Sequence, residues 1–271
     1  MRKSFKLAIV LTLSMLILAA CAPASGDDVG GREVTIAIEN AYLPFNYVDA
    51  VTLEPGGWDY VVWDEICERI NCTPVYVEAA WDGMIQAVSD GQFDAAADGI
   101  TITAERAEKV DFSMGYVAIE QRLLVRIDED RITEIEDIVN DESLRLGTQT
   151  GTTNYETAAT FLSEDRIEAF DTFPFVVQAL VAGDIDAVII DETAGLGYLG
   201  ANKDELKLVG RSLSSDVLGF IFPLGSDLVE PVNAAIQAMI DDGFMDEVNL
   251  EYFGPDFEYT YDDITDGVYA E

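Results

Sequence analysis

The stretch from Asp94 to Arg106, Asp-Ala-Ala-Ala-Asp-Gly-Ile-Thr-Ile-Thr-Ala-Glu-Arg, has the residue types of an anion-binding turn. It predicts an apolar strand that ends near Gly99, followed by alternating apolar residues and threonines. Thr103 is a good N-cap, which puts Arg106 in the first turn of a helix. Because the helix dipole disfavours a cation there, we expect Arg106 to face an anion. A small carboxylate would satisfy the guanidinium, the Thr101 hydroxyl and the free amides of the turn. The alternative is an ordinary cap in which Arg106 pairs with a nearby aspartate.

Polar residues also follow other predicted strands. The buried strand Ile185–Ile190 delivers Asp191 at its carboxyl end, and another strand runs into the hydroxyl-rich turn Gln149–Asn154. Glu39 follows an alternating strand near the N-terminus. Ligands of largely parallel α/β sheets bind at the carboxyl ends of the strands, so these tips are candidates for one shared site. For Asp191, a helix cap is the alternative.

Strands and helices alternate in two successive series. The segment Asp90-Gly-Gln-Phe-Asp-Ala-Ala of the first series matches Ala182-Gly-Asp-Ile-Asp-Ala-Val of the second. The pattern predicts an α/β protein of two lobes, each a mixed, mainly parallel sheet flanked by helices, with a ligand cleft between them. Gly219–Phe222 is expected to cross back to the first lobe, where Leu228–Asp242 forms a helix.

The N-terminus has the layout of a secretory signal. Basic residues precede the apolar run Leu7–Ala20, which is short for a spanning helix. No later segment reaches about 18 uninterrupted apolar residues. The run ends in Leu-Ala-Ala-Cys21, which resembles the bacterial lipoprotein signal, whose cysteine becomes the lipidated first residue. We therefore expect a signal peptide over 1–20, lipidation of Cys21 and a flexible tether over 21–32. Plain signal cleavage with an unmodified cysteine is the alternative.

Charge and composition limit the partners. The chain has 271 residues, enough for two domains, and its 49% hydrophobic content supports real cores. Its net charge is −37. The exported part keeps 12 basic and 52 acidic residues, hence −40. Such a surface repels nucleic acid and anionic lipid, so no nucleic-acid partner is expected. Composition leaves open whether this charge serves a cationic ligand, salt adaptation or solubility.

Cysteine and histidine usage limits the chemistry. With Cys21 assigned to lipidation, Cys67 and Cys72 remain at the end of a predicted helix, and their spacing permits a disulfide in an exported protein. The sequence has no histidine, which excludes serine–histidine and cysteine–histidine nucleophiles. Two cysteines do not complete a zinc shell, so neither a metal nor another cofactor is expected.

Several motifs occur together in a specific order. They are Gly99-Ile-Thr-Ile-Thr with Glu105-Arg106, Val110-Asp-Phe-Ser113, Gly147-Thr-Gln-Thr-Gly-Thr-Thr153, Asp186-Ala-Val-Ile-Ile-Asp191 and Phe253-Gly254. In this order they resemble the bacterial extracellular solute-binding proteins for polar amino acids, family 3. The resemblance runs from roughly Glu33 to Gly254. It implies two α/β lobes, joined by two crossovers, that close over a free amino acid and deliver it to a membrane permease.

The resemblance also implies residue roles at the ligand carboxylate. Arg106 is similar to the guanidinium that clamps the α-carboxylate, with Thr101 and the amide of Gly99 beside it. Thr152 and Thr153 are similar to the second lobe's contribution to the same group. These roles agree with the charges of a zwitterion, which needs a bidentate cation at its carboxylate and an anion at its ammonium.

At the other groups of the ligand, Asp191 is similar to the carboxylate that accepts the α-ammonium. Tyr42 and Trp81 match the aromatic positions that sandwich the ligand side chain. Tyr42 as part of the lobe core and Trp81 as a packing aromatic are the alternatives. Trp58 and Trp63, by contrast, are expected in the core.

Two acidic residues bear on the ligand side chain. Glu39 and Asp98 each stand beside a proposed contact, and Gln149 is placed in the ligand site as well. In relatives, an acid near the Glu39 position can meet a cationic side chain. Asp98 can do the same, or pair with Arg106. We therefore favour arginine, lysine or histidine over glutamine as the ligand.

The resulting hypothesis is a monomeric binding protein, not an enzyme, that serves an ABC transporter. It is exported, either lipid-anchored on the outer face of the cytoplasmic membrane or periplasmic, and its only membrane contact is the lipid anchor. We expect lobe 1 over 33–120 and 218–255, lobe 2 over 121–217 and an acidic tail over 256–271. The alternatives are an enzyme similar to cyclohexadienyl dehydratases, with Glu39 or Asp98 as the acid, and a lipoprotein that presents its ligand to a separate sensor.

Overall fold

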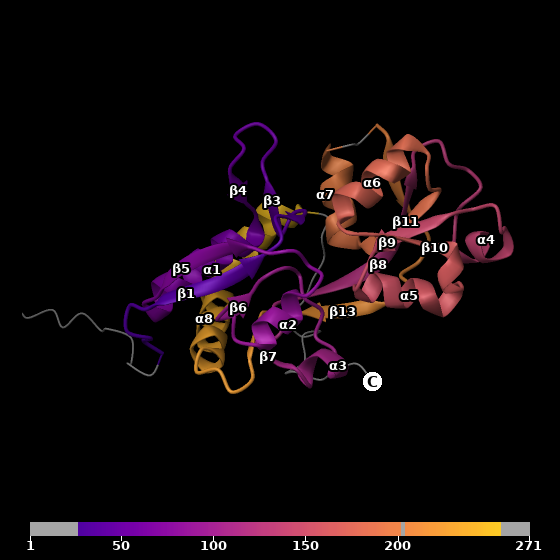
Figure 1. Ribbon diagram of the computed structural model, residues 1–271. Coiled ribbons are helices and arrows are strands. Elements are labelled where there is room, and N and C mark those ends of the chain that lie inside the picture. Colours follow the sequence, from indigo (N-terminus) through magenta and orange to yellow (C-terminus); the bar gives the residue numbers. More distant parts are fainter. Residues whose placement is uncertain (1–26, 202–203, 256–271) are drawn as a thin grey trace, which may run out of the picture.

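The alternating strands and helices form two bodies in the computed structural model, which describes residues 27–201 and 204–255 (Figure 1). The colours of Figure 1 show that one body combines the N-terminal part of the chain with the C-terminal helix α8, whereas the middle of the chain builds the other. The predicted signal peptide, Cys21 and the tail over 256–271 lie outside the described residues.

The first body is built on a five-stranded sheet in the order β5-β1-β6-β14-β7. The strands β5, β1 and β6 are parallel, and β14 runs antiparallel to β6 and β7. A small antiparallel sheet, β2-β3-β4, stands beside it. The elements of this body are β1 (Glu33–Ile38), β2 (Ala41–Tyr42), β3 (Asn46–Val48), β4 (Pro55–Gly56), α1 (Trp58–Ile70), β5 (Thr73–Glu78), α2 (Met84–Ser89), β6 (Ala95–Ala96), α3 (Ala104–Ala107), β7 (Val110–Phe112), β14 (Ile221–Pro223), α8 (Val229–Asp242) and α9 (Phe244–Phe253).

Both faces of this sheet are covered, as its apolar strands require. Successive residues of β1 point to opposite faces: Ile36 joins the core under α1, α8 and α9, and Ala37 joins the core under α2. Trp58 and Trp63 are fully buried in the first of these cores, which confirms their predicted structural role.

The second body has the sheet order β10-β9-β11-β8-β12, with β13 also paired to β8. The strands β10, β9 and β11 are parallel, and β8 is antiparallel to β11 and β12. Helices α6 and α7 pack on one face and α4 and α5 on the other. The elements are β8 (Val117–Arg126), α4 (Ile135–Asn140), β9 (Leu146–Gln149), α5 (Thr153–Phe161), the 3-10 helix η1 (Glu164–Arg166), β10 (Ile167–Phe170), α6 (Phe173–Ala182), β11 (Ala187–Asp191), α7 (Glu192–Ala201), β12 (Leu206–Val209) and β13 (Ser215–Leu218).

Two antiparallel strands connect the bodies. The first residues of β8, from Val117 to Glu120, pair with β13, and its remainder pairs with β11 and β12. At its last residue, Leu218, strand β13 also forms an isolated antiparallel β-bridge with Thr101 of the first body. The structure is therefore the two-lobe α/β fold that was predicted, with both crossovers in one strand pair. The exact lobe boundaries at 120 and 217 stay a prediction.

Several element bounds differ from the sequence-based expectation. The run Trp81–Val88 predicts a helix, but α2 begins only at Met84, because Gly83 before it has a left-handed backbone with φ 87°. The run Gln121–Arg126 predicts an extended segment that leaves the first lobe, and strand β8 starts four residues earlier, at Val117. Cys67 and Cys72 form a disulfide across the end of α1, as their spacing permits. Within residues 27–201 and 204–255, no helix combines the length and apolarity needed to cross a bilayer.

Candidate ligand-binding site

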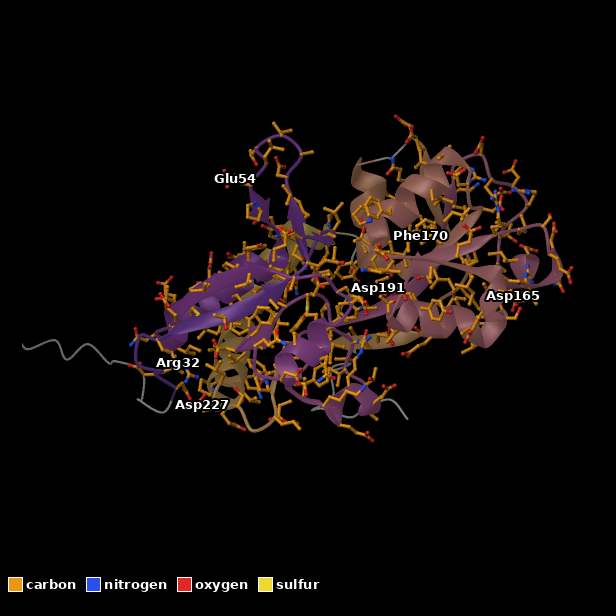
Figure 2. All side chains as sticks on the ribbon, in the orientation of Figure 1. Arg32, Glu54, Asp165, Phe170, Asp191 and Asp227 are labelled. Carbon is orange, nitrogen blue, oxygen red and sulfur yellow. A yellow bond between two sulfur atoms is a disulfide. The ribbon has the colours of Figure 1, made fainter. Side chains whose placement is uncertain are left out.

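A pocket lies between the two lobes, where the carboxyl ends of β1, β9 and β11 meet. Figure 2 places Asp191 at this boundary, far from the surface pair Arg32 and Asp227. The pocket encloses about 320 Å³ that protein atoms do not fill, part of it open to solvent. It is lined by Glu39, Tyr42, Trp81, Asp98, Gly99, Thr101 and Arg106 from the first lobe and by Gln149, Thr152, Thr153, Asn154, Phe173 and Asp191 from the second. Every residue that the sequence proposed for the ligand site lines this pocket; their roles as ligand contacts stay a proposal.

Arg106 is held in place by its own turn and by an aromatic ring. Thr103 caps α3, and its hydroxyl accepts a hydrogen bond from the Arg106 amide at 3.2 Å. The guanidinium donates through Nη1 to the carbonyl of Thr101 at 3.0 Å, and its Cζ lies 5.3 Å from the centroid of the Trp81 ring. Burial lowers the pKa of Arg106. No carboxylate in the described part of the chain forms a salt bridge with it, so the expected alternative, an ion pair with a nearby aspartate, is not found. The guanidinium is buried and available to an anion.

Tyr42 combines the two roles considered for it. Its ring stacks on Phe45 of the first lobe at 5.3 Å between centroids and lies 5.6 Å from Phe173 of the second. It also lines the pocket, and its hydroxyl donates to Asp191. Gly99 makes room for the ring, since a β-carbon there would overlap with Tyr42, and its φ of 56° disfavours other residues.

Asp191 ends β11 with both carboxylate oxygens directed at donors. Tyr42 donates to Oδ2, and Asn154 Nδ2 donates to Oδ1 at 2.8 Å. Burial raises the pKa of Asp191 to about 6, although both hydrogen bonds favour the ionised form. A helix cap is the alternative role for Asp191, and α7 does begin at the next residue, Glu192.

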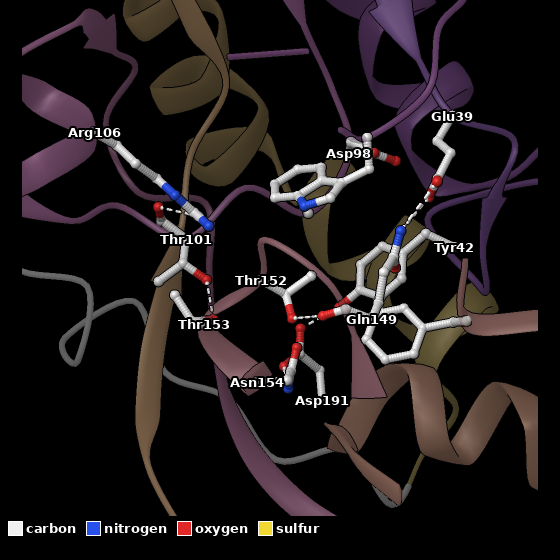
Figure 3. A pocket seen from close by; sticks show the side chains of 13 residues that line it. Glu39, Tyr42, Asp98, Thr101, Arg106, Gln149, Thr152, Thr153, Asn154 and Asp191 are labelled. Atoms are coloured by element: carbon white, nitrogen blue, oxygen red, sulfur yellow. Dashed lines mark hydrogen bonds between the residues drawn. The ribbon is translucent and has the colours of Figure 1, made fainter. Parts of the chain in front are cut away.

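Hydrogen bonds across the pocket join the lobes (Figure 3). Gln149 Nε2 donates to Glu39 Oε1 at 3.0 Å, and the hydroxyls of Thr101 and Thr153 are 3.3 Å apart. Together with the bond between Tyr42 and Asp191, these contacts hold the lobes in a closed arrangement. Figure 3 shows Arg106 on one side of the pocket and Glu39 on the other, so the site offers a cation and an anion at opposite ends.

Asp98 does not pair with Arg106. Its Oδ1 accepts a hydrogen bond from Asn46 Nδ2 at 2.7 Å, and the side chain is buried beside Glu39. Burial, followed by the charge of Glu39, holds the pKa of Asp98 well above its usual range. Burial also raises the pKa of Glu39, with the Gln149 hydrogen bond acting against the shift. This end of the pocket is therefore acidic and poorly hydrated.

Two residues of the pocket were missed by the sequence analysis. Asn154 follows the threonines of the second lobe's turn, and its place in that turn was a usable signal. Phe173 gives no such signal, because an apolar residue at the start of α6 looks like ordinary core. Within residues 27–201 and 204–255, no group of three or more cysteine, aspartate or glutamate side chains is placed to hold a metal ion.

Comparison with protein families decides the assignment. The model of the bacterial extracellular solute-binding proteins, family 3, matches residues 34–255. The chain belongs to this family. The L-cystine-binding protein TcyA of Bacillus subtilis is 27% identical, with 94% of this chain and 98% of TcyA covered. A probable histidine-binding protein of Campylobacter jejuni is 26% identical, with 92% and 98% covered. These relatives of the solute-binding chain are binding proteins, which confirms the expectation that it is not an enzyme.

Solved structures of similar proteins share its two-lobe fold. The arginine-, lysine-, histidine-binding protein ArtJ of Geobacillus stearothermophilus superposes with a TM-score of 0.78 at 26% identity, covering 86% of this chain and 99% of that one. An ancestral arginine-binding protein bound to arginine gives 0.76 at 29% identity, with 82% and 98% covered. The same kind of ancestral protein is also known bound to glutamine, at 28% identity. An ancestral amino acid-binding precursor of cyclohexadienyl dehydratase gives 0.75 at 29% identity, with 82% and 95% covered.

Proposed function

We propose that this solute-binding protein captures a free amino acid with a cationic side chain outside the cytoplasm and delivers it to an ABC transporter permease. One observation carries the preference for a cation. The pocket lining holds three carboxyl groups, of Glu39, Asp98 and Asp191, but one guanidinium, of Arg106. With all four ionised the lining carries a formal charge of −2. A neutral zwitterion leaves this imbalance unchanged, whereas a basic amino acid reduces it.

The proposed pose follows from the positions of the charges. The α-carboxylate meets Arg106 and the hydroxyls of Thr101 and Thr153, and the α-ammonium meets Asp191. The side chain then extends past Tyr42 toward Glu39, on the side of the pocket opposite Arg106 (Figure 3). Since closure removes these groups from water, each charge needs its partner in the ligand.

Calorimetry against arginine, lysine, histidine, glutamine, glutamate and cystine tests the ligand class. We expect a basic amino acid to bind most tightly. Tight binding of glutamine or glutamate with none of arginine would reject the preference for a cation. The comparison is needed because the relatives are named for several different amino acids.

Two substitutions test the pose. Arg106→Ala and Asp191→Ala are each expected to abolish binding while the protein stays folded, because both side chains face the pocket and not an apolar core. Arg32→Ala is the matched control, since Arg32 pairs with Asp227 on the surface and should leave binding unchanged. If either pocket variant unfolds, the residue has a structural role that the pose does not include.

We also propose that the mature chain begins with a lipidated Cys21, is tethered by residues 21–32 and works as a monomer. The Leu-Ala-Ala-Cys run at the end of the signal supports lipidation. Mass spectrometry of the mature N-terminus from membranes should find an acylated cysteine, and Cys21→Ala should release the protein from the membrane fraction. An unmodified N-terminal cysteine would reject the anchor without affecting the ligand.

A further inference from the structure

Three buried carboxyl groups gather at the acidic end of the pocket: Glu39 and Asp98 line it, and Asp59 lies behind them. Glu39 is 9% exposed, Asp98 4% and Asp59 0%. The side-chain amide of Asn46 joins two of them, since its Nδ2 donates to Asp98 at 2.7 Å and to Asp59 at 2.9 Å. None of the three carboxyl groups forms a salt bridge within residues 27–201 and 204–255.

The two carboxyl groups that face the pocket each accept from one side-chain amide and one backbone N–H, but they differ in burial. Glu39 accepts from Gln149 Nε2 and from the backbone N–H of Trp81. Asp98 accepts from Asn46 and from the backbone N–H of Glu39, and it is the more deeply buried. Two adjacent carboxyl groups without a cation cannot both ionise at low cost, and the proton stays on the less favourable site. Burial and the charge of Glu39 raise the pKa of Asp98.

Arg106 lines the same pocket as Asp98 but stands on the side opposite Glu39. The groups within residues 27–201 and 204–255 that interact most strongly with Asp98 are carboxyl groups and tyrosines. They are Glu39 at the end of β1, Tyr42 in β2, Asp59 and Tyr60 in α1, and Tyr116 before β8. The tyrosines stay neutral at neutral pH, because burial raises their pKa values, and the carboxyl groups are either neutral or negative. None of these neighbours supplies a counter-charge to Asp98, whereas the side chain of a basic ligand can.

We infer that Asp98 is a second specificity-determining carboxyl group, which holds a proton in the ligand-free protein and releases it when the cationic side chain of a basic amino acid settles beside Glu39 and Asp98. The O–H bond of the Asp98 carboxyl breaks, the proton passes through the cleft to the buffer, and the ligand cation becomes the counter-charge of the new carboxylate. This inference rests on the proposed function, because it needs an amino acid in the pose described above.

Proton exchange also sharpens selection. A neutral ligand side chain leaves Asp98 protonated and exchanges no proton. A cationic one gains a second carboxylate but must displace the proton. Above about pH 7, where Asp191 with its pKa of about 6 is already ionised, the affinity of a cationic ligand therefore rises with pH while that of a neutral ligand does not. The increase reaches at most tenfold per pH unit for one proton.

Calorimetry in two buffers measures the exchange directly. Arginine is titrated into wild-type protein at about pH 7 in phosphate and in Tris, whose ionisation enthalpies differ. We expect the observed binding heat to differ between the buffers by an amount that reports up to one proton released per arginine. Glutamine, where it binds, should give the same heat in both. Equal heats for arginine would overturn the inference and leave the proposed ligand class intact. If the protein binds neutral amino acids and no basic one, the proposed ligand class itself fails, and the inference fails with it.

Variants identify the group that releases the proton. Asp98→Asn should bind arginine without proton release and with a weaker preference for arginine over glutamine. Asp59→Asn is the matched control, because Asp59 shares the Asn46 amide but does not line the pocket, and it should keep both the release and the preference. Undiminished release in Asp98→Asn, or loss of release in Asp59→Asn alone, would overturn the assignment to Asp98. The wild-type measurement stands independently of how either variant folds.

Discussion

Asp59→Asn tests the physical basis of the acidic core in a way that does not depend on any ligand. Asp59 lies in the first turn of α1 and is fully buried. Its Oδ2 accepts from Asn46 at 2.9 Å, and its Oδ1 has no hydrogen-bond partner within the described residues. Burial raises the pKa of Asp59 from 3.8 to about 7. At neutral pH the folded protein is therefore destabilised by a buried carboxyl group whose desolvation is only partly compensated by hydrogen bonds.

The magnitude follows from proton linkage. Between pH 3.8 and about 7 the folded state keeps the Asp59 proton, whereas the unfolded state has lost it. The free energy of unfolding then falls by about 1.4 kcal/mol for each pH unit, or about 4 kcal/mol over the whole range. The sign is that of a raised pKa: the stabilisation is present below pH 3.8 and is lost as the pH rises through about 7. Asparagine does not titrate, so Asp59→Asn removes this dependence.

Urea denaturation of both proteins between about pH 4 and 8 measures the effect. We expect the free energy of unfolding of Asp59→Asn, relative to that of the wild type, to rise by about 4 kcal/mol between the lower and the higher pH. The side-chain amide that Asp59→Asn introduces also adds N–H donors to a site that lacks acceptors. Their burial lowers the free energy of unfolding of the variant by about 1–3 kcal/mol at every pH, a constant offset that does not change with pH. Asp165→Asn, in the exposed helix η1, controls for the loss of one negative charge. A difference between Asp59→Asn and wild type that stays constant with pH would refute the reasoning.

Two further predictions concern the pocket. Trp81→Ala removes the ring that lies 5.3 Å from the Arg106 guanidinium, and a cation–π contact of about 0.5–2 kcal/mol corresponds to ligand binding about 2- to 30-fold weaker by calorimetry. Unchanged affinity would show that the ring does not position Arg106. The Tyr42 hydroxyl donates to Asp191, and this hydrogen bond lowers the pKa of Asp191. Tyr42→Phe removes the bond and should therefore raise that pKa. In the proposed pose the α-ammonium needs ionised Asp191, so wild-type binding should fall as the pH drops through about 6, and the variant should lose binding at a higher pH. The same midpoint for both proteins in a titration of affinity against pH would contradict this role.

The sequence predicted elements best where hydrophobic periodicity was long and ended in a clear signal. The amphipathic run Trp58–Ile70 predicts a helix, and α1 has these bounds; α8 ends at Asp242, where the predicted helix Leu228–Asp242 also ends, just before Gly243. Short elements were less certain. The apolar strand predicted to end near Gly99 is reduced to β6, Ala95–Ala96, and α2 begins after Gly83. A strand of two residues owes its existence to its neighbours in the sheet, which no local pattern contains.

The residue types of the site were determined by the sequence alone. A threonine-capped turn with Arg106, an aspartate after an apolar strand and a glycine–threonine turn are local patterns, each tied to the end of a strand. Since parallel strands present their carboxyl ends at one edge, local patterns place Arg106 at the strand ends of the first lobe and Asp191 at those of the second. The prediction that both line one cleft needed the repeat of the two lobes and the family resemblance as well.

The pairing of those side chains was decided by the tertiary structure. Closure brings Tyr42 to Asp191 and Gln149 to Glu39, residues separated by 149 and 110 positions in the chain. Burial then leaves Asp98 beside Glu39 without a cation, although the sequence allowed a pair with Arg106. Which polar groups share a buried volume depends on how the two lobes pack, and that packing sums many distant contacts. The charge balance of the pocket, on which the proposed preference for a cationic ligand rests, is therefore a property of the folded molecule.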